Sequence, residues 1–223
     1  MRRKTFTATL SCLCVVLMAC GTAFAQQGKM TSGPYKGPMM PMMVPDSPDA
    51  APFYTNFEAN ACTSCNYDAT NGFLVLGPAN CGIANATQWL AYPFVSKKTG
   101  TTRTVTLGIT DWSICTPTVH GITVQIMGDN CSGAPDTTNV LGTATTNVPT
   151  APCLTARARL AASLTAGVTY WVVVTTNSSA QQMGTTAVWW ETNPAEGSYN
   201  LNDGNGWIGA GLATGTPGAF SVN

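Results

Sequence analysis

The sequence predicts an all-β protein: an antiparallel β-sandwich of jelly-roll type, held by disulfides. Three observations lead to this fold class. Apolar and polar residues alternate in short runs, turn-forming residues separate the runs, and helical patterns are scarce. Nine or ten short strands without a convincing helix are typical of two packed antiparallel sheets.

Residues 1–25 predict a secretory signal peptide. A cationic start at Arg2 and Arg3 precedes an apolar run over residues 10–19, and Ala23-Phe24-Ala25 offers a small-x-small cleavage site. The run is too short to span a bilayer. We therefore expect an exported protein, periplasmic or extracellular, whose mature chain begins at Gln26 and contains no transmembrane segment.

A lipid anchor is the alternative. Leu17-Met18-Ala19-Cys20-Gly21 resembles a lipobox, in which Cys20 would be lipidated and become the new N-terminus. In that case the protein would be anchored to the cell envelope.

Residues 26–52 predict a flexible linker, because six prolines and several glycines interrupt regular structure. The linker is rich in methionine, notably at Met39, Met40, Met42 and Met43. Thioethers are soft ligands that suit Cu(I), so copper binding by this arm is one alternative function. A methionine-rich tether without a metal is the simpler interpretation.

Residues 53–223 predict the sandwich domain. Alternation indicates half-buried strands near residues 105–109 and 122–126, whereas residues 168–176 are apolar on both faces, as in a central strand. Shorter strands are expected at residues 73–76, 89–95, 187–190, 207–208 and 219–222. Asn71-Gly72, Asp203-Gly204 and Asn205-Gly206 are expected to form turns.

Residues 154–164 could form a helix or a strand. Ala and Arg favour a helix, but the apolar residues occupy the even positions and nearly every odd position is polar. The period of two predicts an extended segment with Arg157 and Arg159 facing solvent.

Six cysteines remain after cleavage, which in an exported protein predicts three disulfides. We expect Cys131–Cys153, closing a polar loop over residues 140–149, together with Cys65–Cys81 and Cys62–Cys115. A zinc or redox site at Cys62-x-x-Cys65 is disfavoured, because His120 is the one histidine and lies far away in sequence.

Composition and motifs argue against several functions. Three of the ten basic residues lie in the signal, so seven basic and ten acidic residues remain. This balance disfavours nucleic acid and anionic membranes as partners, and Lys97-Lys98 is interpreted as a solvated loop. No catalytic motif is present. His120 is interpreted as a packed residue, and no cofactor is expected. Glycoside hydrolysis would need paired carboxylates, for which the candidates are Glu58, Glu191 and Glu196.

Several motifs carry a resemblance to a known family: Tyr54-x-Asn56-Phe57, Gln88-Trp89-Leu90-Ala91, Asp129-Asn130-x-Ser132-Gly133-x-Pro135, Thr169-Tyr170-Trp171-Val172-Val173, Gly206-Trp207 and Ala219-Phe220-x-Val222. They resemble the exported bacterial β-sandwich domains called choice-of-anchor domains, over about residues 53–222. The expected C-terminal sorting tail is missing, so Cys20 is the candidate anchor. The family has no established reaction, and the resemblance therefore implies a non-enzymatic module.

The sequence thus predicts a non-enzymatic exported module with a structural or surface-binding role. A carbohydrate-binding module is the main alternative, since aromatic side chains stack on sugar rings and sandwiches often bind polysaccharides. The candidate ligand-binding residues are Trp112, Trp189, Trp190 and Trp207, although each also fits core packing. Asp203 is a candidate calcium ligand, for which a hairpin turn is the simpler interpretation.

Intact-mass measurement of the exported protein tests how the chain is processed. We expect a mass that begins at Gln26 and contains no lipid, because the Ala23-Phe24-Ala25 site is regular. A mass that includes Cys20 and acyl chains would contradict this and make residues 26–52 a membrane tether.

Overall fold

The computed structural model describes residues 51–57, 65–80, 87–112, 120–151, 153–192, 197–202, 207, 213–215 and 217–223. The chain is all-β over these ranges, and none of them contains a helix long and apolar enough to cross a membrane. The strands are β1 (Tyr54–Thr55), β2 (Asp68–Leu76), β3 (Trp89–Val95), β4 (Gly100–Thr101), β5 (Val105–Leu107), β6 (Ile109–Asp111), β7 (Gly121–Asp129), β8 (Pro135–Asn147), β9 (Ala156–Ala158), β10 (Ser163–Leu164), β11 (Thr169–Thr175), β12 (Thr186–Glu191), β13 (Gly197–Asn202), β14 (Ala213–Gly215) and β15 (Phe220–Val222).

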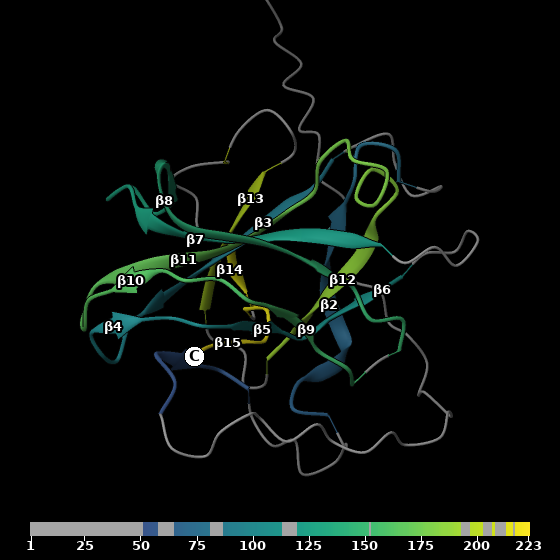
Figure 1. Ribbon diagram of the computed structural model, residues 1–223. Coiled ribbons are helices and arrows are strands. Elements are labelled where there is room, and N and C mark those ends of the chain that lie inside the picture. The colour runs from purple at the N-terminus through teal and green to yellow at the C-terminus, as the bar shows by residue number, and fades with distance from the viewer. Residues whose placement is uncertain are drawn as a thin grey trace, which may run out of the picture.

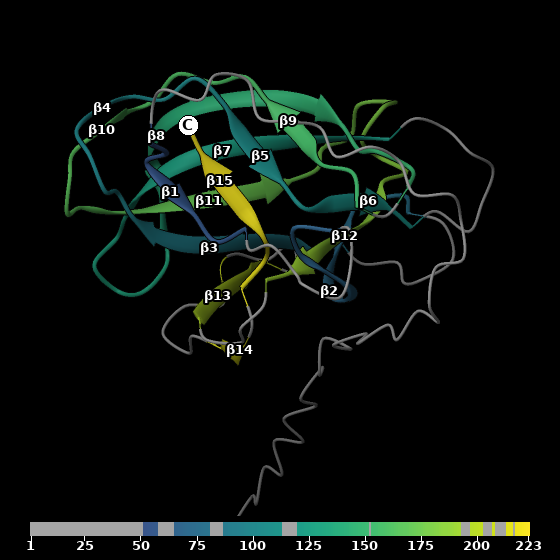
Figure 2. The same ribbon diagram turned by 90° about the horizontal axis from the view of Figure 1, so that it is seen from below.

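The strands form antiparallel sheets in two layers (Figure 1). One layer is a six-stranded sheet in the order β14-β13-β3-β11-β7-β8. The opposite layer contains a four-stranded sheet, β1-β15-β5-β9, and a three-stranded sheet, β2-β12-β6, while β4 and β10 form a separate pair. Seen from below, the four-stranded sheet lies in front of the six-stranded one (Figure 2). The predicted antiparallel sandwich is confirmed, and its jelly-roll type stays a prediction.

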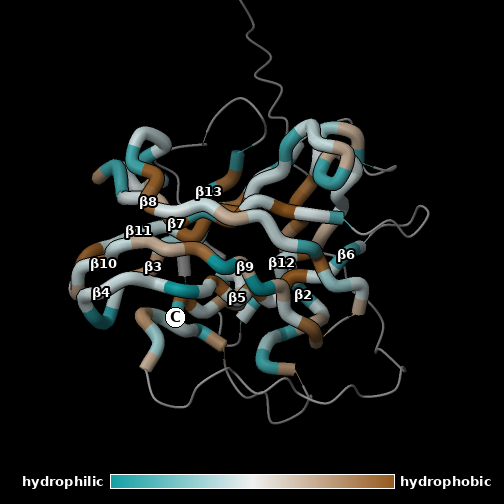
Figure 3. The backbone as a smooth tube through the Cα atoms, viewed as in Figure 1, coloured by the Kyte–Doolittle hydropathy of each residue, from teal (hydrophilic) through white to brown (hydrophobic). Residues whose placement is uncertain are grey.

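The main hydrophobic core fills the space between the layers. It draws on strands of the three largest sheets, as Figure 3 shows by the hydrophobic colour along the inner strands. Ile122, Val124 and Ile126 come from β7, and Val105 and Leu107 come from β5. All five side chains are fully buried. Apolar side chains at every second position therefore bring the sheets together.

Two smaller clusters lie on the outer faces. One covers the three-stranded sheet around Val188 and Trp190. The other lies on the six-stranded sheet around Trp171 and Val173, beneath the turn between β7 and β8. The Asn200 amide donates a hydrogen bond to the Gly133 carbonyl oxygen of that turn (3.1 Å). Strands β11 and β12 are consequently buried on both faces.

The alternation signals are confirmed where they were strongest. In residues 154–164, Ala156, Ala158, Leu160, Ala162 and Leu164 are buried. The odd positions from 157 to 163 are half-buried or exposed. The period of two was therefore the correct reading of this segment.

Strand β8 shows that the predicted polar loop over residues 140–149 is wrong. It is the longest strand in the described part of the chain and pairs with β7 along its length, with a register shift around Met127. Because β8 lies at the edge of the sheet and exposes many side chains, it lacks apolar alternation. Its threonines have high β propensity and were the available signal.

Asn71-Gly72 lies inside β2, so the turn predicted there is wrong. A Cβ at Gly72 would lie 2.5 Å from Val188 Cγ1 and 2.7 Å from the Trp189 carbonyl oxygen. Glycine here allows β2 and β12 to approach each other, which is the alternative reason for glycine inside a strand.

Gly108 marks the point where the chain passes from one sheet to another. Leu107 ends β5 in the four-stranded sheet, and Ile109 begins β6 in the three-stranded sheet. The Gly108 amide donates to Ala219 O (2.8 Å), and its carbonyl accepts the Trp190 N–H (2.8 Å). A Cβ would lie 2.9 Å from the Tyr67 ring.

The disulfide joins Cys65 to Cys153, so the predicted Cys131–Cys153 and Cys65–Cys81 bonds are wrong. Cys131 is exposed and unpaired at the turn before β8, whereas Cys153 follows the end of that strand. Twelve steps along a strand span about 40 Å, which keeps the two cysteines apart. The predicted partners Cys62, Cys81 and Cys115 lie outside the described residues.

Tyr67 reinforces the contact made by the disulfide. Its hydroxyl donates a hydrogen bond to Leu154 O at 2.7 Å, one residue beyond Cys153. Burial raises the pKa of Tyr67 above its usual value, so the phenol remains a donor throughout the neutral range. The start of β2 and the segment before β9 are thus held by a covalent bond and a hydrogen bond.

Replacing Cys65 and Cys153 together with serine should lower the free energy of unfolding by about 2–5 kcal/mol, because the bond closes a long loop. The two cysteines are 88 residues apart. Denaturant titration measures the change, and non-reducing peptide mapping identifies the pair.

Cys131→Ser is the matched control, with an expected effect within about 0.5 kcal/mol because its side chain is exposed and unpaired. The assignment fails if the control is as destabilised as the double variant, or if a peptide joins Cys131 to Cys153.

Candidate functional site

Trp189 and Trp190 lie on opposite faces of β12, and both are buried. Trp189 lies in the main core, where its indole N–H donates to Ala219 O at 3.0 Å. Trp190 lies in the cluster over the three-stranded sheet and donates to Thr110 Oγ1 at 2.7 Å. Neither ring has an exposed face for stacking on a sugar in this structure, and the ligand-binding role of the two residues stays a prediction.

Trp112 and Trp207 are half-buried. Trp112 packs edge-on against Trp190, with ring centroids 6.1 Å apart, and its backbone N–H donates to Thr186 O. Trp207 packs against the cluster around Trp171 and forms an isolated bridge with Asn202. The structure places these two tryptophans on different sheets and does not bring the four candidates into one platform.

The remaining metal and lipid candidates cannot be placed. Met39, Met40, Met42, Met43, Asp203 and Cys20 lie outside the described residues, as do Glu58 and Glu196. Within the described ranges, no group of three or more His, Cys, Asp or Glu side chains is arranged to hold a metal ion.

Glu191 lies directly opposite Asp68 in the pairing of β12 with β2, where the register shifts. Burial disfavours the charged Asp68 carboxylate, but hydrogen bonds from Thr70 and Asn71 outweigh this and hold the pKa of Asp68 below its usual value. Asp68 is therefore ionised at neutral pH. An ionised carboxylate has no proton to donate. The general acid of a glycosidase needs a raised pKa, and the pKa of Asp68 is lowered instead.

His120 lies beside a carboxylate that the sequence did not single out. Its Nδ1 is 3.0 and 3.1 Å from the two carboxylate oxygens of Asp111, and the two side chains are 9% and 6% exposed. Asp111 ends β6, and His120 immediately precedes β7. The pair thus joins the three-stranded sheet to the six-stranded sheet.

The other side of the imidazole faces a turn. A Cβ on Gly184 would lie 3.5 Å from His120 Nε2. A carboxylate bound to Nδ1 is also how hydrolases orient a catalytic histidine, with Nε2 toward a nucleophile. Here Nε2 borders the backbone of the turn before β12 rather than an open surface, since His120 is buried.

The four-stranded sheet gathers basic residues at one end. Arg103 precedes β5 and donates its backbone N–H to Asn223 O, next to the end of β15, while Arg159 follows the end of β9. At the β1 edge, the Lys97 N–H donates to Phe53 O, and Lys98 Nζ lies 4.4 Å from the centre of the Phe53 ring. We call Lys97, Lys98, Arg103, Arg157 and Arg159 the basic end.

A row of polar side chains crosses the outer face of this sheet. Thr55 pairs with Ser221, Ser221 with Thr106, and Thr106 with Arg157. Their strand neighbours, such as Val105, Leu107 and Phe220, point into the main core. The row ends in the Arg157 guanidinium. Ser221, in its middle, is buried, and its hydroxyl accepts a hydrogen bond from the Asn223 amide (3.0 Å), so the half-buried Thr55, Thr106 and Arg157 are the members that reach solvent.

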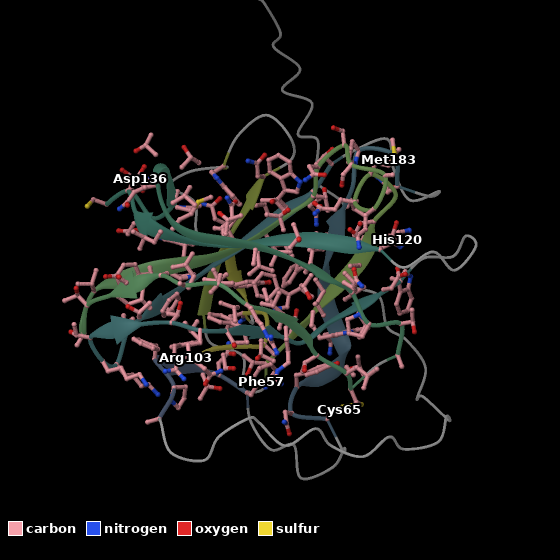
Figure 4. The ribbon with its side chains drawn as sticks, in the orientation of Figure 1. Phe57, Cys65, Arg103, His120, Asp136 and Met183 are labelled. Atoms are coloured by element: carbon pink, nitrogen blue, oxygen red, sulfur yellow. A yellow bond between two sulfur atoms is a disulfide. The ribbon has the colours of Figure 1, made fainter. Side chains whose placement is uncertain are left out.

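Acidic side chains lie elsewhere in the described part of the chain. None belongs to the four-stranded sheet: Asp68 and Glu191 are on β2 and β12, Asp111 on β6, and Asp129 and Asp136 on β7 and β8. Figure 4 shows Arg103 at the lower left of the domain and Asp136 at the upper left. Although the described residues contain five bases and five acids, the charges are segregated.

Sequence reasoning missed the basic end, because its members come from three separate segments and only Lys97-Lys98 are adjacent.

Comparison of the chain with protein-family models and with curated proteins gave no match. The resemblance to choice-of-anchor domains therefore stays a prediction.

His120→Ala should lower the free energy of unfolding by about 2–4 kcal/mol, because it removes the partner of a buried carboxylate. Asp111→Asn should cost less, since the amide oxygen still accepts a hydrogen bond. Denaturant titration measures both. Gln181→Ala, at an exposed residue of the neighbouring turn, is the control and should stay within about 1 kcal/mol. Equal effects in all three variants would contradict a specific role for the pair.

Proposed function

We propose that this chain is a non-enzymatic exported β-sandwich module that binds an anionic extracellular surface through the basic end. One observation carries the proposal: all five basic side chains of the described residues lie on or beside the four-stranded sheet, which bears no Asp or Glu in its strands. A module of the choice-of-anchor type, tethered or released, would present this end to the surface outside the cell.

Local charge decides whether an anionic surface binds this protein more than net charge does. The described residues carry balanced numbers of acids and bases, yet field lines from clustered charges act over about a Debye length, about 8 Å at physiological salt. Arg103 lies beside the four-stranded sheet, whereas Asp136 lies on β8 of the six-stranded sheet. An anionic surface approaching the basic end therefore meets a positive potential.

The polar groups with catalytic potential support a non-enzymatic role. His120 and Asp111 face each other inside the domain and connect two sheets. Asp68 is held ionised by hydrogen bonds from Thr70 and Asn71. These hydrogen-bonded groups contribute to folding. Each would have to break its hydrogen bonds before it could act on a substrate.

A neutral carbohydrate is the second candidate ligand, favoured by Trp112. Its side chain is half-buried and packs edge-on against Trp190, so part of the residue is exposed to solvent, and an exposed indole can stack on a sugar ring. The Cu(I) alternative depends on Met39 to Met43. It is tested by whether deletion of those residues abolishes tight Cu(I) binding.

Co-sedimentation with isolated bacterial cell walls tests the leading proposal. We expect the protein to sediment with the walls at low salt and to be released at 1 M salt, where the Debye length falls to about 3 Å. Arg103→Gln with Arg159→Gln should weaken the binding, because both side chains are exposed and lie at the basic end.

The matched control is Ser178→Glu with Ala180→Glu, which changes net charge by the same amount at exposed positions of the turn before β12. Binding that persists in the arginine double variant but is lost in Trp112→Ala would transfer the function to a neutral sugar. Release of soluble wall fragments during incubation would contradict a non-enzymatic role.

A further inference from the structure

We infer that the partner of the basic end is an acidic polysaccharide, carboxylated or sulfated, that lies across the outer face of the four-stranded sheet. This inference rests on the proposed function and specifies its ligand. It depends on the alignment of the hydroxyl row with the basic residues, on the absence of aromatic and large apolar side chains from that row, and on the charge of the site.

The row supplies donors in an extended line. Thr55, Ser221, Thr106 and Arg157 follow one another across four neighbouring strands. Adjacent strands are about 4.8 Å apart, so the row is about 14 Å long. Hydroxyl groups both donate and accept hydrogen bonds, which matches the hydroxyls of a sugar polymer.

The charges lie beside one end of this row. Val105, Val222 and Ala158 are aligned across the sheet, and Arg103, Asn223 and Arg159 are near these strand ends. Lys97 and Lys98 are held against Phe53 at the start of β1. An extended polymer along the row thus meets Arg157 on the sheet and further cations at its border, and a guanidinium can bind carboxylate or sulfate oxygens with two N–H donors.

The outer face of the four-stranded sheet lacks the large apolar side chains that bind anionic membranes. The large apolar side chains that are exposed in the described residues are Val95, Val140, Val168 and Met183, and none lies on β1, β15, β5 or β9. Val95 and Val168 lie near Lys97 at the end of β3, outside the hydroxyl row. A membrane-binding face would insert such groups.

Single-stranded nucleic acid is held by aromatic side chains that stack on its bases. The aromatic rings of the four strands, Tyr54 and Phe220, instead stack on each other in the core, with centroids 4.9 Å apart. The outer row therefore offers hydrogen bonds and charge without a stacking surface, as an acidic polysaccharide requires.

Binding of the full exported protein to defined polymers tests the inference. The probes are polygalacturonate, heparin, neutral dextran, polyadenylate and phosphatidylglycerol vesicles, compared at one ionic strength by titration calorimetry or co-sedimentation. We expect polygalacturonate, heparin or both to bind more tightly than the other three probes. Arg103→Gln with Arg159→Gln should weaken that binding about two- to thirtyfold, the range expected when two exposed ion pairs are lost.

One control and one uncharged test variant keep the outcome specific. Ser178→Glu with Ala180→Glu should leave polysaccharide affinity within about twofold, because this exposed turn, which leads to Met183, lies at the opposite corner of the domain from Arg103 (Figure 4). Thr106→Val, which removes a hydroxyl from the middle of the row without changing charge, should also weaken binding. Thr106 is half-buried at the surface, so denaturant titration confirms that each variant is folded.

The possible failures are distinguishable. Equal binding of dextran, or tighter binding of polyadenylate or vesicles, overturns the inference but leaves a surface-binding module. Equal loss in the Ser178 and Ala180 control shows that net charge, rather than charge at the basic end, decides binding, and it overturns both the site and the inference. Binding to cell walls without binding to either acidic polysaccharide overturns the inference alone, whereas no binding to walls or polymers overturns the proposed function as well.

Discussion

The contacts of Trp189 join the three largest sheets of this protein. The residue belongs to β12 in the three-stranded sheet, and its ring lies edge-on to Tyr92 of the six-stranded sheet, with centroids 4.6 Å apart. It also contacts Phe220 of the four-stranded sheet at 6.0 Å and donates to the backbone of Ala219. Gly218 permits this packing, because a Cβ there would lie 2.6 Å from the indole nitrogen. One side chain therefore fixes where both layers meet, and the core strands are positioned around it.

The fold class could be read from the sequence because alternation reports burial directly. Strands such as β5, β7 and β11 carry apolar residues that face the core, and these were predictable. Strand β8 was not, since an edge strand with exposed threonines forms by pairing with β7 and leaves no apolar pattern. The error over the disulfide has the same cause. A loop would have allowed Cys131 and Cys153 to meet, whereas a long strand separates them.

The candidate site was less predictable, because contacts between distant segments create it. Trp189 and Trp190 are neighbours in β12 and therefore point in opposite directions. The sequence did not reveal that a second apolar cluster covers the outer face of β12 and buries Trp190 as well. Likewise, Lys97-Lys98 looked like an isolated solvated pair. Only the antiparallel order β1-β15-β5-β9 brings the neighbourhoods of Arg103 and Arg159 to the same end of a sheet.

The pairing of β1 with β15 has a consequence for how the domain could be connected to other chains. Phe53 N donates to Val222 O at 2.8 Å, so the first and last strands of the folded region are side by side. Domains whose ends are adjacent tolerate insertion into a host loop and circular permutation, because a short peptide can bridge the ends without moving a strand. New ends could then be opened at an exposed turn far from the basic end, such as residues 178–181. A circularly permuted chain could therefore keep the same spatial order of strands.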